Sequence, residues 1–531
     1  MRVIQFSVSK LILGVLLTFL FLVLIYCFDK GFDLEDEGLA LSLASGLGSI
    51  KNSFYNYYLF FPIDFGIKEL RIFKLILVLI MVLCLSKLTQ PKFDFSNLFF
   101  LSIGLFCVYS LLGQSLSYNN IVFFLLFIYL IIYLKINPKN SYFLVFLLGI
   151  VVSLIFYAKF TSSLSLVIWT LILIFYNYRN SMGRIFFHSS IFILGFFLVH
   201  VFIFFLYGEN IFWNVILIGF EYSTFPGNYQ KSKIFEGLIS SFRWVVIILS
   251  SGFLLGISTR SNLKLTKRFL FFLLFSSSLI YFFKAHYTIN WLRFYEFSVA
   301  FFSIFVLGFL ISRVKFEDLI GKKIELYISL FIFPFFAYIG TNVYFFEFIQ
   351  LFIFFYFFLI LILFEKADVT MALKNVIIVF LAFILFVRVL FNVFIFPFNQ
   401  PTILSEFIEV EYFGREKIKL EINQAIYIND LKNMLNRHIL PDQPIIGLYA
   451  MPGDILLSGY RNFYNPCIWN ETQWKFLSSK MMSDGITKFP RVLTNNLGSV
   501  LVLYPNSLII DSVSHYKKGK IYLLDIQLKY Y

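Results

Sequence analysis

The sequence predicts an all-α polytopic membrane protein of about 13 transmembrane helices, followed by a small C-terminal α/β domain outside the cytoplasm. The 531-residue chain is 60% hydrophobic and only 14% charged, long apolar runs recur along it, and its composition changes near residue 398. A soluble domain carries roughly 45–50% apolar and about 25% charged residues. These observations exclude a water-soluble enzyme and a disordered chain, and they favour a chain embedded in a lipid bilayer.

The apolar runs are each about 17–24 residues long, and a helix needs about 20 residues to cross the hydrocarbon core. Charged residues or Asn, Gly and Pro separate one run from the next. The N-terminal run has no small-residue cleavage signal, which predicts a retained signal anchor. The thirteen predicted crossings are 11–28, 70–88, 97–113, 119–135, 141–157, 160–177, 185–207, 237–257, 267–284, 290–312, 324–340, 347–364 and 373–396.

The distribution of charge predicts the orientation of these crossings. The net charge is +14, but the tail from residue 398 holds 14 Lys/Arg and 12 Asp/Glu, so the excess lies among the membrane segments and does not indicate nucleic-acid binding. With the N-terminus in the cytoplasm, the short inside breaks hold 18 Lys/Arg and every one contains at least two of them. This is the pattern that the positive-inside rule requires. We therefore expect a multi-pass protein of the inner (plasma) membrane whose C-terminal tail lies outside.

Two regions follow from this organisation. Residues 1–397 form the transmembrane domain, with long outside loops at 29–69 and 208–236. Residues 398–531 form a soluble α/β domain, for which helical spacing predicts a helix and short β-prone runs predict strands. The expected elements of the tail are a helix at 416–438 and strands at 445–449, 499–504 and 520–528. The four cysteines have no spacing typical of a zinc site or a disulfide framework.

The strongest candidate site is an acidic cluster in the first outside loop. Asp33, Glu35, Asp36 and Glu37 place four carboxylates in five positions directly after the first predicted helix. Such a cluster binds a cation, takes up a proton or faces water, and the last of these is the ordinary role of an acidic loop. Its hard oxygen ligands suit Mg²⁺, Mn²⁺ or Ca²⁺, and the spacing leaves a metal site open.

Basic residues lie on the same predicted side of the membrane. Lys159 sits in the short turn between the fifth and sixth crossings, and Arg293 lies just inside the tenth. Charge near the membrane is costly and indicates a functional site by default, although a lysine at a helix end also snorkels to the interface. The further candidates on this side are Lys284, His286, Arg243 and the acidic Glu221.

An acidic pair in the first outside loop of a many-helix protein resembles the GT-C glycosyltransferases, which include protein O-mannosyltransferases and the aminoarabinose transferases of lipid A. The stretch Tyr157-Ala158-Lys159-Phe160-Thr161 is similar to a Thr-Lys-Pro-Thr-like stretch of bacterial relatives, with Phe160 where Pro is common. Gly340-Thr341-Asn342 resembles another short stretch of that group. Thirteen helices followed by an outside domain also match the aminoarabinose-transferase layout, and the resemblance covers roughly residues 1–400.

The resemblance implies an enzyme that takes a sugar from a polyprenyl-phosphate donor and transfers it to a lipid, glycan or protein acceptor on the outer face. Asp36 would be the general base for the acceptor hydroxyl, with inversion at the anomeric carbon, and Glu37 would assist. A hydroxyl is a poor nucleophile at neutral pH, so it needs a nearby carboxylate to take its proton. The departing phosphate needs fixed cations, and the candidates are Lys159, Lys284, His286 and Arg293.

Three other readings compete. An O-antigen polymerase or ligase is also many-helical and lipid-linked, but such enzymes place their key Arg and His residues in a large late outside loop. A lipid or glycan transporter is expected to show repeated halves and charges near the midplane, whereas most charges here lie at helix ends. A sensor would need far fewer crossings than thirteen. The sequence does not identify the sugar or the acceptor.

Overall fold

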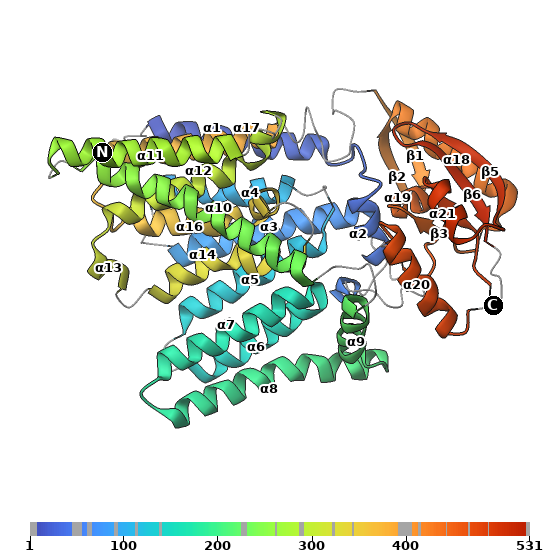
Figure 1. Cartoon of the computed structure of the whole chain (residues 1–531), viewed down its shortest axis with the longest axis horizontal. Coiled ribbons are helices and arrows are strands. Elements are labelled where there is room, and N and C mark those ends of the chain that lie inside the picture. The colour runs from blue at the N-terminus through green and yellow to red at the C-terminus, as the bar shows by residue number, and fades with distance from the viewer. Residues whose placement is uncertain are drawn as a thin grey trace, which may run out of the picture.

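A computed structural model gives the architecture of the chain, which is mostly helical with a small region of β-sheet near the C-terminus. The long helices lie side by side in one body, and the C-terminal domain caps one end of them (Figure 1). The structure describes residues 8–44, 56–60, 66–89, 94–111, 115–136, 141–224, 231–260, 263–285, 291–320, 324–341, 345–390, 406–412, 416–441, 443–465, 468–486 and 488–526.

Each of the thirteen predicted crossings overlaps a helix of the structure. The twelfth is divided into three consecutive pieces. The last is described as far as Leu390, and the rest of that predicted crossing, to residue 396, lies outside the described part of the chain. The helices are α1 (Val8–Cys27), α3 (Ile67–Thr89), α4 (Phe95–Leu111), α5 (Tyr118–Lys135), α6 (Ser141–Ala158), α7 (Phe160–Tyr178), α8 (Met182–Tyr207), α10 (Lys231–Ser258), α11 (Leu265–Ala285), α12 (Trp291–Arg313), α14 (Ile324–Tyr338), the series α15 (Phe345–Phe348), η2 (Ile349–Phe352) and α16 (Ile353–Phe364), and α17 (Met371–Leu390).

Among the described residues, eight helices are long and apolar enough to cross a membrane, and five shorter apolar helices accompany them. The number of thirteen crossings therefore stays a prediction. The outer faces of the long helices carry exposed hydrophobic side chains, such as Phe186 (76% exposed) and Phe205 (78% exposed) of α8. A soluble protein rarely exposes so much contiguous apolar surface, so these faces fit a hydrocarbon environment.

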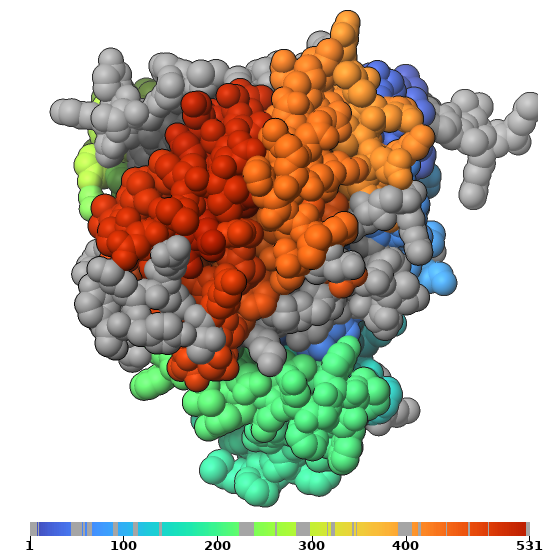
Figure 2. Space-filling view, turned by 90° about the vertical axis from the view of Figure 1, so that its right-hand side faces the viewer, coloured from blue at the N-terminus to red at the C-terminus, as the bar shows by residue number. Residues whose placement is uncertain are grey.

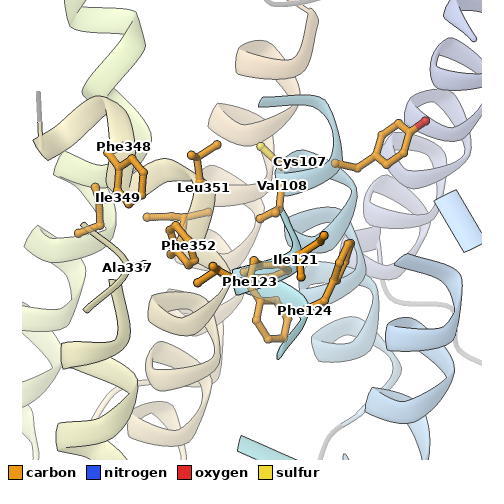
Figure 3. Close-up of a cluster of buried hydrophobic side chains, with 14 of the residues drawn as sticks. Cys107, Val108, Ile121, Phe123, Phe124, Ala337, Phe348, Ile349, Leu351 and Phe352 are labelled. Atoms are coloured by element: carbon orange, nitrogen blue, oxygen red, sulfur yellow. The ribbon is translucent and has the colours of Figure 1, made fainter. Parts of the chain in front are cut away.

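The core of the helical body forms around α16, in which every residue is buried. A helix that is apolar on all sides is stable only when other helices surround it, and α4, α12 and α14 pack against α16. Figure 3 shows the neighbouring cluster, in which Phe123 of α5 points toward Phe352 of η2. Their ring centroids are 5.9 Å apart with the rings edge to face, which is a favourable aromatic geometry.

Successive connections between the long helices lie alternately at the two ends of the helical body. At the end away from the C-terminal domain, three predicted inside breaks touch: Arg260 donates to the Ser312 carbonyl, and the backbone N–H of Asp368 donates to the Arg313 carbonyl at 3.1 Å. The short helix α13 (Phe316–Ile320) lies at this end (Figure 1). This arrangement is what a series of alternating crossings requires, while the side of the membrane that each end faces stays a prediction.

The C-terminal domain begins with an antiparallel hairpin, β1 (Phe407–Tyr412) and β2 (Glu416–Glu421), followed by α18 (Ile422–His438). A four-stranded sheet has the order β3-β4-β6-β5, in which β3 and β4 are parallel and the other neighbours are antiparallel. Its strands are β3 (Ile446–Leu448), β4 (Val492–Thr494), β5 (Leu508–His515) and β6 (Gly519–Asp525), and its helices are α19 (Pro452–Leu457), α20 (Glu471–Ser483) and α21 (Leu497–Leu503).

Two expectations for this domain were wrong. Residues 416–421 form a strand and not the start of a helix, because Ile418 and Leu420 alternate with exposed or half-buried lysines and pair with β1. The predicted strand at 499–504 is the helix α21, whose first turn is capped by the Asn496 side chain accepting from the Ser499 N–H. The predicted strands at 445–449 and 520–528 correspond to β3 and β6.

Close packing of α6 and α8 depends on two glycines. A Cβ at Gly149 would lie 2.2 Å from the Phe192 carbonyl oxygen, and a Cβ at Gly195 would lie 2.2 Å from the Phe146 carbonyl oxygen. Small residues at such crossings allow two helix backbones to approach within a membrane.

We predict that Gly149→Leu destabilises the protein by about 3 kcal/mol, because the side chain must displace backbone of α8. The measurement is thermal unfolding of the full chain in detergent. Gly183 has no atom within 4 Å of its ideal Cβ position, so Gly183→Leu serves as the control. Equal melting temperatures for the two variants would contradict the predicted packing.

Candidate functional site

The acidic loop, residues 28–37, leads from α1 into α2 (Asp36–Ala44) at the end of the bundle that the C-terminal domain covers (Figure 1). Asp33 is fully buried and caps the start of α2. Its carboxylate accepts hydrogen bonds from the backbone N–H groups of Glu35 (2.9 Å) and Asp36 (3.3 Å). Carboxylates are favourable at a helix N-terminus, where N–H groups point outward. Asp33 therefore shapes the loop.

Glu37 forms a buried ion pair with Arg71 of α3. The closest distance is 3.1 Å, from Arg71 Nη2 to Glu37 Oε2, and the two side chains are 0% and 1% exposed. Glu37 also accepts from the backbone N–H groups of Asp33 (3.0 Å) and Ser115 (2.6 Å). Burial raises the pKa of Glu37, but the Arg71 guanidinium and these donors outweigh it and hold the pKa below its ordinary value. Glu37 is thus an ionised, fully engaged carboxylate.

Arg71 binds backbone groups of the acidic loop in addition to Glu37. Its guanidinium donates to the carbonyl oxygens of Phe28 at 2.9 Å and Gly31 at 2.7 Å. Because Arg71 comes from the next helix, these bonds fasten the backbone of the acidic loop to α3. Lys74 lies one turn further along α3, is fully buried, and has its Nζ 5.0 Å from the centroid of the Tyr109 ring.

Asp36 differs from both neighbours. It is half-buried, and within the described part of the chain no group donates a hydrogen bond to its carboxylate. Burial, followed by the negative charges of Glu35 and Glu37, raises the pKa of Asp36 to about 6. A carboxylate with a raised pKa is a stronger base, and this one titrates near physiological pH. Burial also raises the pKa of Asp33, but its carboxylate is occupied by two backbone N–H groups, so Asp36 is the member of the cluster best placed to take a proton.

The C-terminal domain rests directly on the acidic loop. The backbone N–H of Gly31 donates to the Lys419 carbonyl at 2.8 Å, the Gln424 amide donates to the Phe32 carbonyl at 2.9 Å, and the Gly453 N–H donates to the Leu34 carbonyl at 2.9 Å. The space-filling view shows the domain, coloured orange to red, covering much of this end of the molecule (Figure 2). The acidic loop is thus enclosed between the helices and the domain.

The backbones of the two regions approach each other closely where α2 meets α19. A Cβ at Gly38 would lie 2.4 Å from the Gly453 backbone nitrogen, and a Cβ at Gly453 would lie 2.5 Å from the Leu34 carbonyl oxygen. Only glycine permits this approach without moving the backbone. Next to it, the Asn462 amide donates to the Ser42 hydroxyl at 3.0 Å.

Charged groups of the domain also face the loop. Lys518 Nζ lies 2.7 Å from Glu35 Oε1. Asp454 of α19 is fully buried and accepts from the Tyr427 hydroxyl at 2.6 Å. Burial raises the pKa of Asp454 to about 6, although the charge of Lys518 and the Tyr427 bond oppose the shift. The structure therefore brings carboxylates from the loop and from the domain to the same junction.

Lys159 lies in the turn between α6 and α7. It is 4% exposed, donates to the Ala337 carbonyl, and has its Nζ 4.9 Å from the centroid of the Phe348 ring. The first outside loop reaches this turn, because the Asn56 N–H donates to the Tyr157 carbonyl at 2.9 Å. The 3₁₀ helix η1 (Tyr57–Phe60) packs against both α2 and α6. Lys159 thus belongs to the same end of the bundle as Asp36.

The remaining candidates are elsewhere or outside the description. Arg243 of α10 hydrogen-bonds the Tyr281 hydroxyl at an exposed position on the bundle. Glu221 belongs to α9 (Ile211–Thr224), a helix within the second outside loop, and pairs with Lys480 of α20 at 2.6 Å. His286 and the side chains of Lys284 and Arg293 lie outside the described part of the chain.

Arg71 and Lys74 were absent from the sequence-based candidates. Both fall within the second predicted crossing, 70–88, where the apolar pattern predicts a membrane helix and not a site. The sequence does carry a signal for them, because two cations three positions apart near the end of an apolar helix are costly and mark a partner or a site.

The acidic cluster does not present its oxygens to a common point. Asp33 points to backbone N–H groups and Glu37 to Arg71. In the described residues, no group of three His, Cys, Asp or Glu side chains is arranged to hold a metal ion. A divalent cation at the acidic loop therefore stays a prediction from the sequence.

We predict that Arg71→Met lowers the free energy of unfolding by about 3–5 kcal/mol, because it removes the ion-pair partner of a buried carboxylate. Thermal unfolding of the full chain in detergent is the measurement. The control is Lys417→Met, which removes one partner of the exposed pair Lys417–Glu409 and should leave the midpoint nearly unchanged. An unchanged midpoint for Arg71→Met would refute the ion pair.

The comparisons with known proteins returned nothing that assigns a family. No family model matches the chain, and no curated protein and no solved structure matches it.

Proposed function

We propose that the protein is an integral membrane glycosyltransferase of the GT-C type, which transfers a sugar from a polyprenyl-phosphate donor to an acceptor on the outer face of the membrane. The observation that carries the proposal is Asp36, a half-buried carboxylate with a raised pKa and no hydrogen-bond donor among the described residues. Asp36 lies at the end of a helical body with apolar outer faces, and the buried Lys159 belongs to the same end.

In the proposed reaction, Asp36 takes the proton of the acceptor hydroxyl while that oxygen attacks the anomeric carbon. The bond between the anomeric carbon and the phosphate oxygen breaks, so the configuration inverts and polyprenyl phosphate leaves. Asp36 is half-buried, so its carboxylate reaches the border of the enclosed loop. Glu37 is held by Arg71 and supports the geometry of the loop without exchanging a proton.

The departing phosphate gains negative charge and is stabilised by cations in a site that excludes water. Lys159 fits this role, because among the described residues its ammonium has a single protein acceptor, the Ala337 carbonyl, and keeps further N–H donors. Lys284, His286 and Arg293 are proposed to complete the phosphate site. The proposed partners are a polyprenyl-phosphate sugar and a lipid, glycan or protein acceptor, in the inner (plasma) membrane with the C-terminal domain outside.

We predict that Asp36→Asn lowers the transfer rate about 10²–10⁴-fold, because the amide cannot accept the proton. The assay incubates membranes containing the full chain with radiolabelled polyprenyl-phosphate hexose and measures release of polyprenyl phosphate. Glu409→Gln changes an exposed acid of β1 and is expected to transfer at the wild-type rate. Normal transfer by Asp36→Asn would remove Asp36 from the role of base.

The pH dependence gives a second prediction. Because the pKa of Asp36 is raised to about 6, the carboxylate is ionised above this pH and protonated below it. We therefore expect kcat/KM to fall about tenfold per pH unit below pH 6, and Asp36→Asn to lose this acidic limb. An acidic limb with its midpoint near 4 would disagree with the environment described for Asp36.

The same assay separates a transferase from a transporter. A transporter would move the lipid-linked sugar across vesicles and leave the sugar–phosphate bond intact. Thin-layer analysis of the labelled lipid after incubation distinguishes the two outcomes, since only transfer yields free polyprenyl phosphate.

A further inference from the structure

Several of the contacts between the C-terminal domain and the first outside loop fall on the residues that flank Asp36. On one side, the Leu34 carbonyl accepts from the Gly453 N–H at 2.9 Å, and the Glu35 carboxylate meets Lys518 at 2.7 Å. On the other side, Gly38 fits against Gly453, where no Cβ could be placed. The backbone before and after Asp36 is therefore held by groups from a region more than 400 residues later in the chain.

Lys518 is itself well supported. It lies in the turn between β5 and β6, and its backbone N–H donates to His515 Nδ1 at 2.9 Å. His515 is buried, and its Nδ1 also accepts from the Lys517 N–H at 2.8 Å. The Lys518 ammonium additionally donates to the Ala450 carbonyl at 3.2 Å. A lysine fixed at both its backbone and its ammonium group can hold Glu35 in one place.

We propose that the C-terminal domain is a positioning part of the active site, in which Lys518 holds Glu35 and thereby sets the place of Asp36 in the loop. The assignment of Asp36 as the base rests on the function proposed above, whereas the docking of the domain on the loop does not. Lys518 is a positioning residue, because it acts through Glu35.

Docking is tested without any assay of transfer. Ser42 is 3% exposed beneath the domain, where its hydroxyl accepts from Asn462. The parent is the full chain in membranes, with the native cysteines replaced and S42C introduced. The rate at which this thiol reacts with a maleimide reports opening of the junction. We expect K518E to raise this rate about tenfold, because like charges then face each other, and E35K to do the same.

Reversing both charges restores an attractive pair, so K518E combined with E35K should return the labelling rate to within about twofold of the parent. The matched control is K475E, which reverses one member of the exposed pair Lys475–Glu471 in the same domain and should leave labelling unchanged. Two results would overturn the proposal regardless of transfer activity. One is a labelling rate in K518E equal to that of the parent, and the other is a labelling rate in the double variant as high as in either single variant.

The transfer assay tests the positioning role. We expect K518M to lower kcat about tenfold with KM for the donor unchanged, since a misplaced base affects the chemical step, and K518R to recover most of the rate. Loss of transfer in D36N together with full kcat in K518M would overturn the positioning role and leave the proposed function standing. If membranes containing the wild-type chain show no transfer, the proposed function is wrong. The labelling rates then still test whether the domain docks on the loop.

Discussion

The buried ion pair between Glu37 and Arg71 is the interaction on which the site depends. Arg71 holds the carboxylate and, through the same guanidinium, the carbonyl oxygens of the loop that leads into α2. An ion pair removed from water is stable only when its remaining donors and acceptors are also satisfied, and here backbone groups of the acidic loop and of Ser115 do this. The ion pair thereby holds the loop in its conformation, and this conformation sets the positions of the other carboxylates.

The same constraint separates the roles of three neighbouring acids. Asp33 is used by backbone N–H groups and Glu37 by a guanidinium, so each is committed to holding the loop. No described group donates a hydrogen bond to the Asp36 carboxylate, and burial together with the negative charges beside it raises its pKa. Closely spaced carboxylates thus differ in their pKa. Burial and neighbouring negative charges raise the pKa of a carboxyl group, whereas a neighbouring cation lowers it.

The C-terminal domain changes how the acidic loop should be understood. A loop between membrane helices is ordinarily exposed and variable in position, and an acidic one is ordinarily solvated. Here the glycine contact between α2 and α19 and the backbone hydrogen bonds to Gly31 and Leu34 enclose it. The enclosure lowers the local dielectric, so charges in the loop interact more strongly than they would in water.

The sequence by itself determined where the helices lie, because an apolar run of sufficient length has few alternatives to a helix in lipid. It also identified the acidic cluster and Lys159 as unusual. It did not distinguish a strand from a helix at residues 416–421 or 499–504, where short runs satisfy both periodicities. Tertiary structure alone decided that Glu37 pairs with Arg71, that Lys518 reaches Glu35, and that Asp36 has no such partner among the described residues. These pairings join residues 34 to several hundred positions apart, and no local pattern encodes which charges meet when helices and domain pack together.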